Sequence, residues 1–187
     1  MDEIAWTTPE PAWRMRQRSA TIRPMTVTIR AATPHDADTI HAFICALAVY
    51  EREPDAVQVT AAILRDQLAS PRPPFECLLA ESAGVALGFA LFVQNYSSWR
   101  GRAGLHLEDL FVPEQHRGHG VGSALLTALA RLAVDRGCAR LEWAVLDWNQ
   151  PAIDFYRGLG AIPLDEWTTY RLTDRALVDV AARETRP

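Results

Sequence analysis

The sequence has few cysteines, no excess of basic residues and no long apolar run, and each shortage excludes a class of protein. Its 3 cysteines are widely spaced among 187 residues and stand in apolar contexts. This pattern predicts reduced thiols rather than a disulfide framework, and hence a cytoplasmic protein. The 19 basic residues are outnumbered by 23 acidic ones, for a formal net charge of -4. We therefore expect no broad basic face for nucleic acid.

No apolar segment reaches the roughly 18 to 20 residues that a membrane-spanning helix needs. Residues 1–24 contain four arginines with no apolar segment after them, which argues against a cleavable signal peptide. We expect residues 1–24 to be a poorly ordered extension and residues 25–187 to form one domain. Trp6 and Trp13 are the residues that could dock the extension on that domain.

Hydrophobic residues make up 49% of the chain, enough for one globular domain with a substantial core. Periodicity and turn signals predict strands over 26–31, 75–82, 83–96, 103–112 and 139–147, helices from Thr33 and over 60–70, 122–137, 149–160 and 174–184, and a strand or hairpin over 161–173. This order predicts an α/β (α+β) domain with a mixed, mostly antiparallel central sheet and helices on both faces.

Three glycines stand at every second position, Gly118, Gly120 and Gly122, between a strand and the mouth of a helix. Glycine allows positive φ and close approach, so successive N–H groups can converge on an anion. The helix N-terminus adds unpaired N–H groups and a positive dipole end. Neither a P-loop nor a Rossmann turn fits the spacing. We interpret the stretch as a diphosphate cradle flanked by Arg117; a helix entrance that is glycine-rich only for tight packing is the alternative.

The segment Arg117-Gly118-His119-Gly120-Val121-Gly122 resembles the R-x-x-G-x-G signature of the GCN5-related N-acetyltransferases (GNAT), in their strand, loop and helix setting. The resemblance runs from about Ile29 to Leu172. Two longer segments, LEDLFVPEQHRGHGVGSALL and AVLDWNQPAIDFYRGLGA, are similar to the diamine acetyltransferase group, which includes spermidine/spermine and thialysine acetyltransferases.

The resemblance implies that acetyl-CoA binds as co-substrate, without a metal, and that its acetyl group passes to a primary amine by direct attack in a ternary complex. The pantetheine arm is expected to add to a strand edge through main-chain hydrogen bonds. The implied coenzyme-binding residues are Leu110, Phe111, Val112, Arg117, Gly118, His119, Gly120, Val121, Gly122, Ser123, Asn149, Gln150, Pro151, Ala152 and Tyr156.

Amide formation requires a neutral amine, but an alkylammonium group has a pKa near ~10.4. The resemblance implies that Glu108 receives the amine proton through water and that the Tyr156 phenol donates a proton to the departing thiolate. The alternatives are a solvated strand end and a core tyrosine. Glu108 and Asp109 would point to opposite sheet faces if their strand is regular.

The resemblance also places Tyr50 and Glu51, at the end of the first long helix, in an amine pocket. Nearby carboxylates would concentrate cations there, although a charged helix end has a purely structural explanation as well. The expected substrate-binding residues are Tyr50, Glu51, Trp99, Glu108 and Asp109. Ser97 stands where polyamine-specific members carry an acid, so thialysine is the favoured acceptor and a polyamine a possible one.

Two other readings remain open at this point. The acceptor could be a protein amine or an antibiotic, or the chain could be a non-catalytic acyl-CoA-binding module. The five histidines show no metal-ligand spacing with cysteine. Relatives in the group are often homodimers, so we expect a homodimer, and the apolar face of the last helix could pack on the domain or on a partner.

Overall fold

The structure is a computed structural model that describes residues 26–183. The expected N-terminal extension, residues 1–24, lies outside the described residues. The described chain forms two compact units, residues 26–144 and residues 145–183. The first unit contains the whole sheet, and the second contains two helices and an irregular connection between them.

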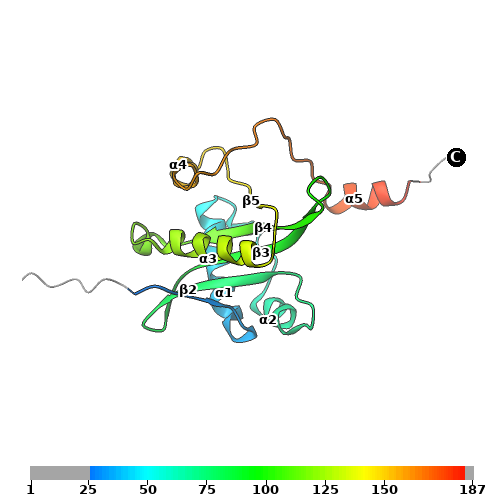
Figure 1. Ribbon diagram of the computed structural model, residues 1–187. Helices are drawn as coiled ribbons and strands as arrows, with labels where there is room; N and C mark the ends of the chain where they lie inside the picture. The colour runs from blue at the N-terminus through cyan, green and yellow to red at the C-terminus, as the bar shows by residue number, and fades with distance from the viewer. Residues whose placement is uncertain (1–25, 184–187) are drawn as a thin grey trace, which may run out of the picture. The chain divides into compact units, whose positions relative to one another are not determined.

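The sheet has five strands in the order β1-β2-β3-β4-β5. The first three neighbouring pairs are antiparallel, and only β4 and β5 run parallel. The predicted mixed, mostly antiparallel sheet is therefore confirmed (Figure 1). The strands are β1 Thr28–Ala31, β2 Glu76–Ser82, β3 Val85–Ser97, β4 Arg102–Phe111 and β5 Leu141–Trp143.

Helices cover both faces of this sheet, as expected. On one face lie α1 and α2, which share a core cluster with β2, β3 and β4, and α3 lies on the other face (Figure 1). The helices of the first unit are η2 Pro34–Asp36, α1 Ala37–Tyr50, η3 Pro54–Ala56, α2 Ala61–Ala69, η4 Glu114–His116 and α3 Val121–Asp135, where η marks a short 3-10 helix.

Local sequence signals explain several of these boundaries. The Thr60 hydroxyl accepts a hydrogen bond from the Ile63 N–H at 3.3 Å and begins α2. Ala83 and Gly84 both have positive φ, 49° and 77°, in the tight turn between β2 and β3. Gly137, with a φ of 66°, follows the end of α3.

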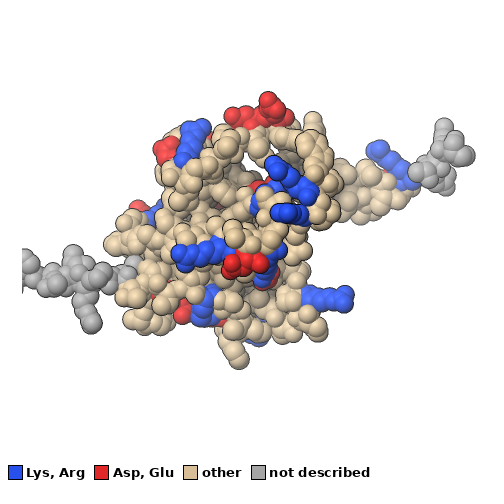
Figure 2. Space-filling view, viewed as in Figure 1, with Lys and Arg blue, Asp and Glu red and all other residues tan. Residues whose placement is uncertain are grey.

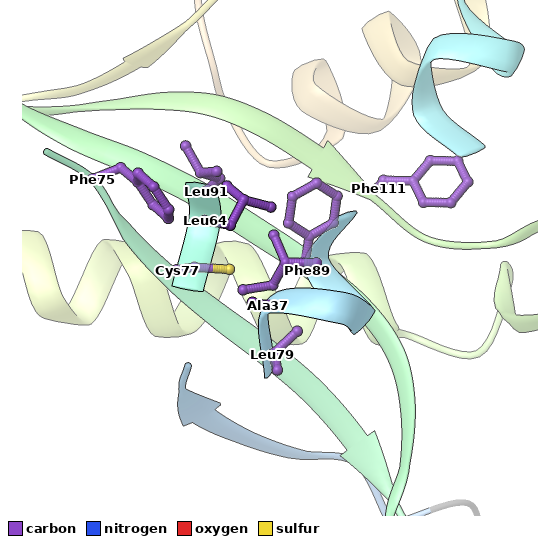
Figure 3. Close-up of a cluster of buried hydrophobic side chains, with 9 residues drawn as sticks. Ala37, Leu64, Phe75, Cys77, Leu79, Phe89, Leu91 and Phe111 are labelled. Atoms are coloured by element: carbon purple, nitrogen blue, oxygen red, sulfur yellow. The ribbon is translucent and has the colours of Figure 1, made fainter. Parts of the chain in front are cut away.

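The core between the sheet and α1 is built around aromatic rings. The Phe43 ring of α1 stacks on Phe89 of β3, with 5.7 Å between ring centroids, and also contacts Phe111 at 6.2 Å. Figure 3 shows Phe89 and Phe111 in one cluster with Leu79 and Cys77 of β2. These contacts fix the body of α1 against the end of β4.

The second unit contains α4 Gln150–Gly158 and α5 Asp174–Ala181. The Asn149 side chain accepts a hydrogen bond from the Ala152 N–H and begins α4 as expected. The predicted strand or hairpin over 161–173 is wrong, because this segment is irregular and largely exposed. A strand needs a ladder partner, and residues 145–183 contain no other strand. The strand predicted over 139–147 shortens to β5.

Three further expectations concern the surface and the thiols. All three cysteines are free, as expected for reduced thiols. Within residues 26–183, no helix combines the length and apolarity needed to cross a membrane. Figure 2 shows basic and acidic side chains scattered among uncharged ones, with no continuous basic area on the face in view.

Candidate active site

The loop between β4 and α3 holds two glycines in the left-handed region. Gly118 has a φ of 74° and Gly120 a φ of 80°, values that other residues adopt only with strain. A Cβ built on either glycine would meet no atom within 4 Å. Packing therefore does not explain these glycines. Their backbone conformation does, and the open space above them is what a close-lying ligand requires.

The start of α3 supplies hydrogen-bond donors at the same place. The Ala124 N–H donates to the Gly120 carbonyl at 2.9 Å, so the helical N–H groups before Ala124 have no intrahelical acceptor. The His119 ring Nδ1 lies 2.7 Å from the Arg117 carbonyl and fixes the preceding turn. A loop of bare main chain that leads into a helix N-terminus fits the diphosphate of acetyl-CoA.

Arg117 lies between this loop and the end of α1. Its Nε donates to the Val112 carbonyl at 2.8 Å. Its guanidinium carbon lies 4.7 Å from the centroid of the Tyr50 ring and 5.9 Å from that of Phe111. The predicted cradle and the predicted amine pocket are thus in contact through one side chain.

Strand β4 is irregular where the two adjacent acids stand. Leu107 pairs with Phe92 and Asp109 pairs with Leu91, so Glu108 is the extra residue of a β-bulge. The expectation that Glu108 and Asp109 face opposite sides required a regular strand, and the bulge overturns it. A bulge of this kind turns both side chains toward one face.

The strand register and one side-chain contact identify that face as the one covered by α1. Leu91, the register partner of Asp109, belongs to the core cluster with α1 and α2. Glu108 Oε2 lies 3.7 Å from Nε2 of His106, two residues earlier on the same side of the strand. The two carboxylates therefore lie together beneath the end of α1.

Glu51, Glu108 and Asp109 form an acid cluster. The pKa of Asp109 is raised to about 6, mainly by burial and then by the charges of Glu108 and Glu51. Burial also raises the pKa of Glu51. Because the charges of Glu108 and Glu51 disfavour ionisation of Asp109, a cation placed beside Asp109 relieves the repulsion. The arrangement therefore suits an ammonium group.

The end of β4 has a ladder partner on one side only. The parallel β4–β5 ladder pairs Leu105 to Leu107 with Leu141 to Trp143 and extends no further among the described strands. From Asp109 to Phe111, β4 continues to pair with β3. Its other edge there has the geometry for an extended ligand that adds as a strand, as expected for pantetheine.

The sequence analysis did not predict two residues that lie beside the site, Gly88 and His106. Gly88 of β3 lies so close to the end of β4 that a Cβ would come 2.6 Å from the Phe111 carbonyl oxygen. An isolated glycine inside a strand pattern signals such an approach. His106, beside Glu108, could have been found from its spacing of two residues on a strand.

The remaining predicted residues lie elsewhere. Trp99 is 88% exposed in the turn before β4, about 20 Å of strand from Glu108, so the structure does not bring it to the acid cluster. Tyr156 lies half-buried on α4 in the second unit, with its ring 5.4 Å from that of Phe155. Asn149 to Ala152 form the start of that helix. The catalytic roles of Tyr156 and Glu108 stay predictions.

Comparison with known proteins identifies the class. Residues 40–161 match the family model described as Acetyltransferase (GNAT) family, and the chain belongs to this family. The match crosses the boundary between the two units, so both contribute to one family domain. The chain is an acetyltransferase, and acetyl-CoA is the acetyl donor that its family uses.

Individual relatives within the family are similar over most of their length. The chain is 36% identical over 168 residues to thialysine N-epsilon-acetyltransferase of Bos taurus, covering 84% of this chain and 98% of the relative. It is 34% identical to L-ornithine N5-acetyltransferase NATA1 of Arabidopsis thaliana, covering 90% and 93%. A solved integron cassette protein from the mobile metagenome of V. cholerae is similar with a TM-score of 0.72 at 26% identity, covering 85% and 99%.

Proposed function

We propose that the protein transfers the acetyl group of acetyl-CoA to a primary amine of a small diamine or lysine-like molecule, with thialysine favoured and a polyamine possible. The acid cluster under the end of α1 carries this proposal, because it offers a cation site one loop away from the diphosphate cradle. The activities named for the two relatives, on thialysine and on ornithine, support the same class of acceptor.

The donor site combines main chain and side chain. Residues Gly118 to Ser123 hold the diphosphate through N–H groups, and the edge of β4 from Leu110 to Val112 orients the pantetheine arm. Bound acetyl-CoA supplies the acetyl group as a thioester. Asn149 to Ala152, at the start of α4, are further coenzyme-binding residues that the family resemblance implies.

The acceptor site works by charge and proton transfer. Glu51 and Asp109 attract the ammonium form of the amine, and Tyr50 lines the pocket beside them. Glu108, which is exposed, takes the amine proton through water and passes it to solvent. The phenol of Tyr156 donates a proton to the departing sulfur. Trp99 does not belong to the acid cluster and could contact only a part of the acceptor that extends beyond it.

An acceptor panel tests the proposal directly. Thialysine, lysine, ornithine, diaminopropane, putrescine and spermidine are supplied with acetyl-CoA, and release of free thiol is measured. We expect the highest kcat/KM with thialysine. Turnover only with an aminoglycoside or a peptide amine would replace the acceptor class. Coenzyme binding without thiol release across the panel would make the chain a binding module.

Tyr156→Phe separates chemistry from binding. Removal of the phenolic proton donor is expected to lower kcat about 100-fold or more, within the usual range for general acid catalysis, while the calorimetric Kd for CoA changes less than about threefold. Phe155→Leu, on the neighbouring ring, is the matched control and should keep most of kcat. Equal turnover of Tyr156→Phe and the unmodified protein would contradict the assigned role.

We also propose a cytoplasmic homodimer. Three free thiols suit a reducing compartment. The segment 161–173 exposes large apolar side chains, with Ile162 at 83%, Trp167 at 70% and Tyr170 at 92% of their full accessible area. Such a patch favours association, and a second copy of the chain is the partner that a self-complementary, symmetric contact would supply.

A further inference from the structure

We propose that Arg117 is a positioning residue that couples coenzyme binding to the shape of the amine pocket. The inference rests on the proposed function and adds to it a link between its two subsites. Arg117 follows Val112 in the loop that leads to the cradle, and Tyr50 is the last residue of α1, next to Glu51 of the acid cluster. Arg117, Tyr50 and Glu51 all belong to the first unit.

The contacts define how Arg117 is held. Its Nε donates to the Val112 carbonyl at 2.8 Å, which anchors the side chain to the residue that follows β4. The guanidinium carbon then lies 4.7 Å from the Tyr50 ring centroid. This distance is within the range of a cation–π contact, in which arginine is the commonest cation.

The core holds the end of α1 through Tyr50, and Arg117 adds a contact from the loop that follows β4. Phe43 fixes the body of the helix by stacking on Phe89. Beyond Tyr50 the chain turns sharply, and Arg52 has a left-handed φ of 68°. The Glu51 and Glu53 N–H groups donate to Leu47 and Ala48 within the same last turn. Arg117 therefore joins this turn to the loop between β4 and α3, here called the coenzyme loop, from outside the helix.

The guanidinium has donors to spare for an anion in the loop. It presents five N–H donors in a planar fork, and Nε uses one of them on Val112. The cation–π contact with Tyr50 uses no N–H donor, so the donors at the edge of the fork stay available. A diphosphate on Gly118 to Ser123 would immobilise this edge, and with it the ring of Tyr50 and the adjacent Glu51.

The consequence is positive coupling between the two ligands. Coenzyme binding orders the turn at residues 50–53, so the amine meets a formed pocket and binds more tightly to the coenzyme complex than to the free enzyme. A cation–π contact of this kind contributes enough for about a threefold to tenfold change in an equilibrium constant.

Hydrogen exchange tests the link without relying on catalysis. Peptides covering 47–53 and 117–124 are followed in the full-length protein, with and without CoA. We expect CoA to slow exchange of both segments at least about threefold. In Arg117→Lys, which keeps the charge but loses the planar fork, CoA should still protect 117–124 but no longer 47–53.

Kinetics provides the second readout. Arg117→Lys is expected to raise the amine KM about threefold to tenfold, with kcat changed less than about twofold, and to weaken CoA binding by a similar factor, because the same guanidinium edge holds the diphosphate. In a Tyr50→Leu background the same substitution should have no further effect on KM. Tyr50→Phe keeps the ring and should respond to Arg117→Lys as the unmodified protein does. Arg65→Lys, on α2, is the control for substitution elsewhere.

Each result decides between the alternatives. Equal protection of 47–53 in Arg117→Lys, or additive KM effects in the double variant, would overturn the coupling. Loss of CoA affinity alone would make Arg117 a simple diphosphate ligand. If CoA fails to protect 117–124 in the unmodified protein, the donor site fails instead. All 19 basic residues are arginines, so intact mass reveals at once whether the introduced lysine becomes acetylated.

Discussion

Asp109 is the residue whose ionisation the fold opposes, since its pKa is raised to about 6 by burial and by its acidic neighbours. A carboxyl with a raised folded pKa stabilises the fold while it is protonated. That stability is complete below the unfolded pKa, near ~3.9, and is lost as pH rises through about 6.

Asp109→Asn mimics the protonated form at every pH. We expect this substitution to raise the free energy of unfolding at pH 8 by at most about 3 kcal/mol and to change it little near pH 4. Its amine KM should rise at pH 8, because one of the attracting charges is gone. Urea unfolding at both pH values checks the first claim, with exposed Asp66→Asn as control. The same difference at both pH values would contradict the assignment.

At this scale the sequence could indicate which residues matter but not how they meet. Tyr50, Glu51, Glu108 and Asp109 were all predicted from family likeness, and the structure brings them to one place. The stacking of Arg117 on Tyr50 could not be predicted, because it joins residues far apart in sequence and depends on how α1 crosses the sheet.

Among the elements, β3 approaches the end of β4 most closely at Gly88. A Cβ there would come 2.6 Å from the Phe111 carbonyl oxygen, which is backbone and cannot turn aside. We expect Gly88→Ala to displace the end of β4, to cost about 1–3 kcal/mol of stability and to weaken CoA binding severalfold.

Thermal unfolding and calorimetry with CoA measure both effects of Gly88→Ala. Gly158→Ala is the matched control, because a Cβ at Gly158 on α4 would meet nothing within 4 Å and its φ is not positive. That variant should be neutral or slightly stabilised, as alanine favours helix. Unchanged CoA affinity in Gly88→Ala would show that the loop is positioned by other contacts.

Element boundaries with local signals were predictable. The Asn149 cap, the Thr60 cap and the Ala83-Gly84 turn depend on residues adjacent in sequence. The bulge at Glu108 was not predictable, because it depends on the register between β3 and β4 rather than on β4 alone. The segment 161–173 has β-forming residues, yet within residues 145–183 it lacks a neighbouring strand.

At the scale of the whole molecule, sequence reasoning predicted the sheet type and the two helical layers, because alternation and helical periodicity report which faces are buried. It could not predict that residues 161–183 would leave large side chains exposed. Exposure of a segment depends on its tertiary contacts, and alternation along the sequence does not report these.

The exposed segment makes assembly testable. We expect the protein to sediment as a dimer at micromolar concentration, and Trp167→Ser combined with Tyr170→Ser to shift it toward monomer, because both side chains are largely exposed in the single chain. Analytical ultracentrifugation over a concentration series measures the shift. Tyr96→Ser, another exposed aromatic at 64%, is the control. A monomeric unmodified protein would contradict the proposal.

The extra residue in β4 divides the strand into two segments of opposite phase. Upstream of Glu108, odd-numbered side chains face α3, and downstream they face α1. Removing Glu108 would make Leu107 and Asp109 neighbours in a regular ladder and would leave the faces of the following side chains unchanged. A deletion at Glu108 therefore removes one carboxylate of the acid cluster and keeps the faces of the following residues, whereas a deletion elsewhere in the strand reverses the face of every residue between it and the bulge.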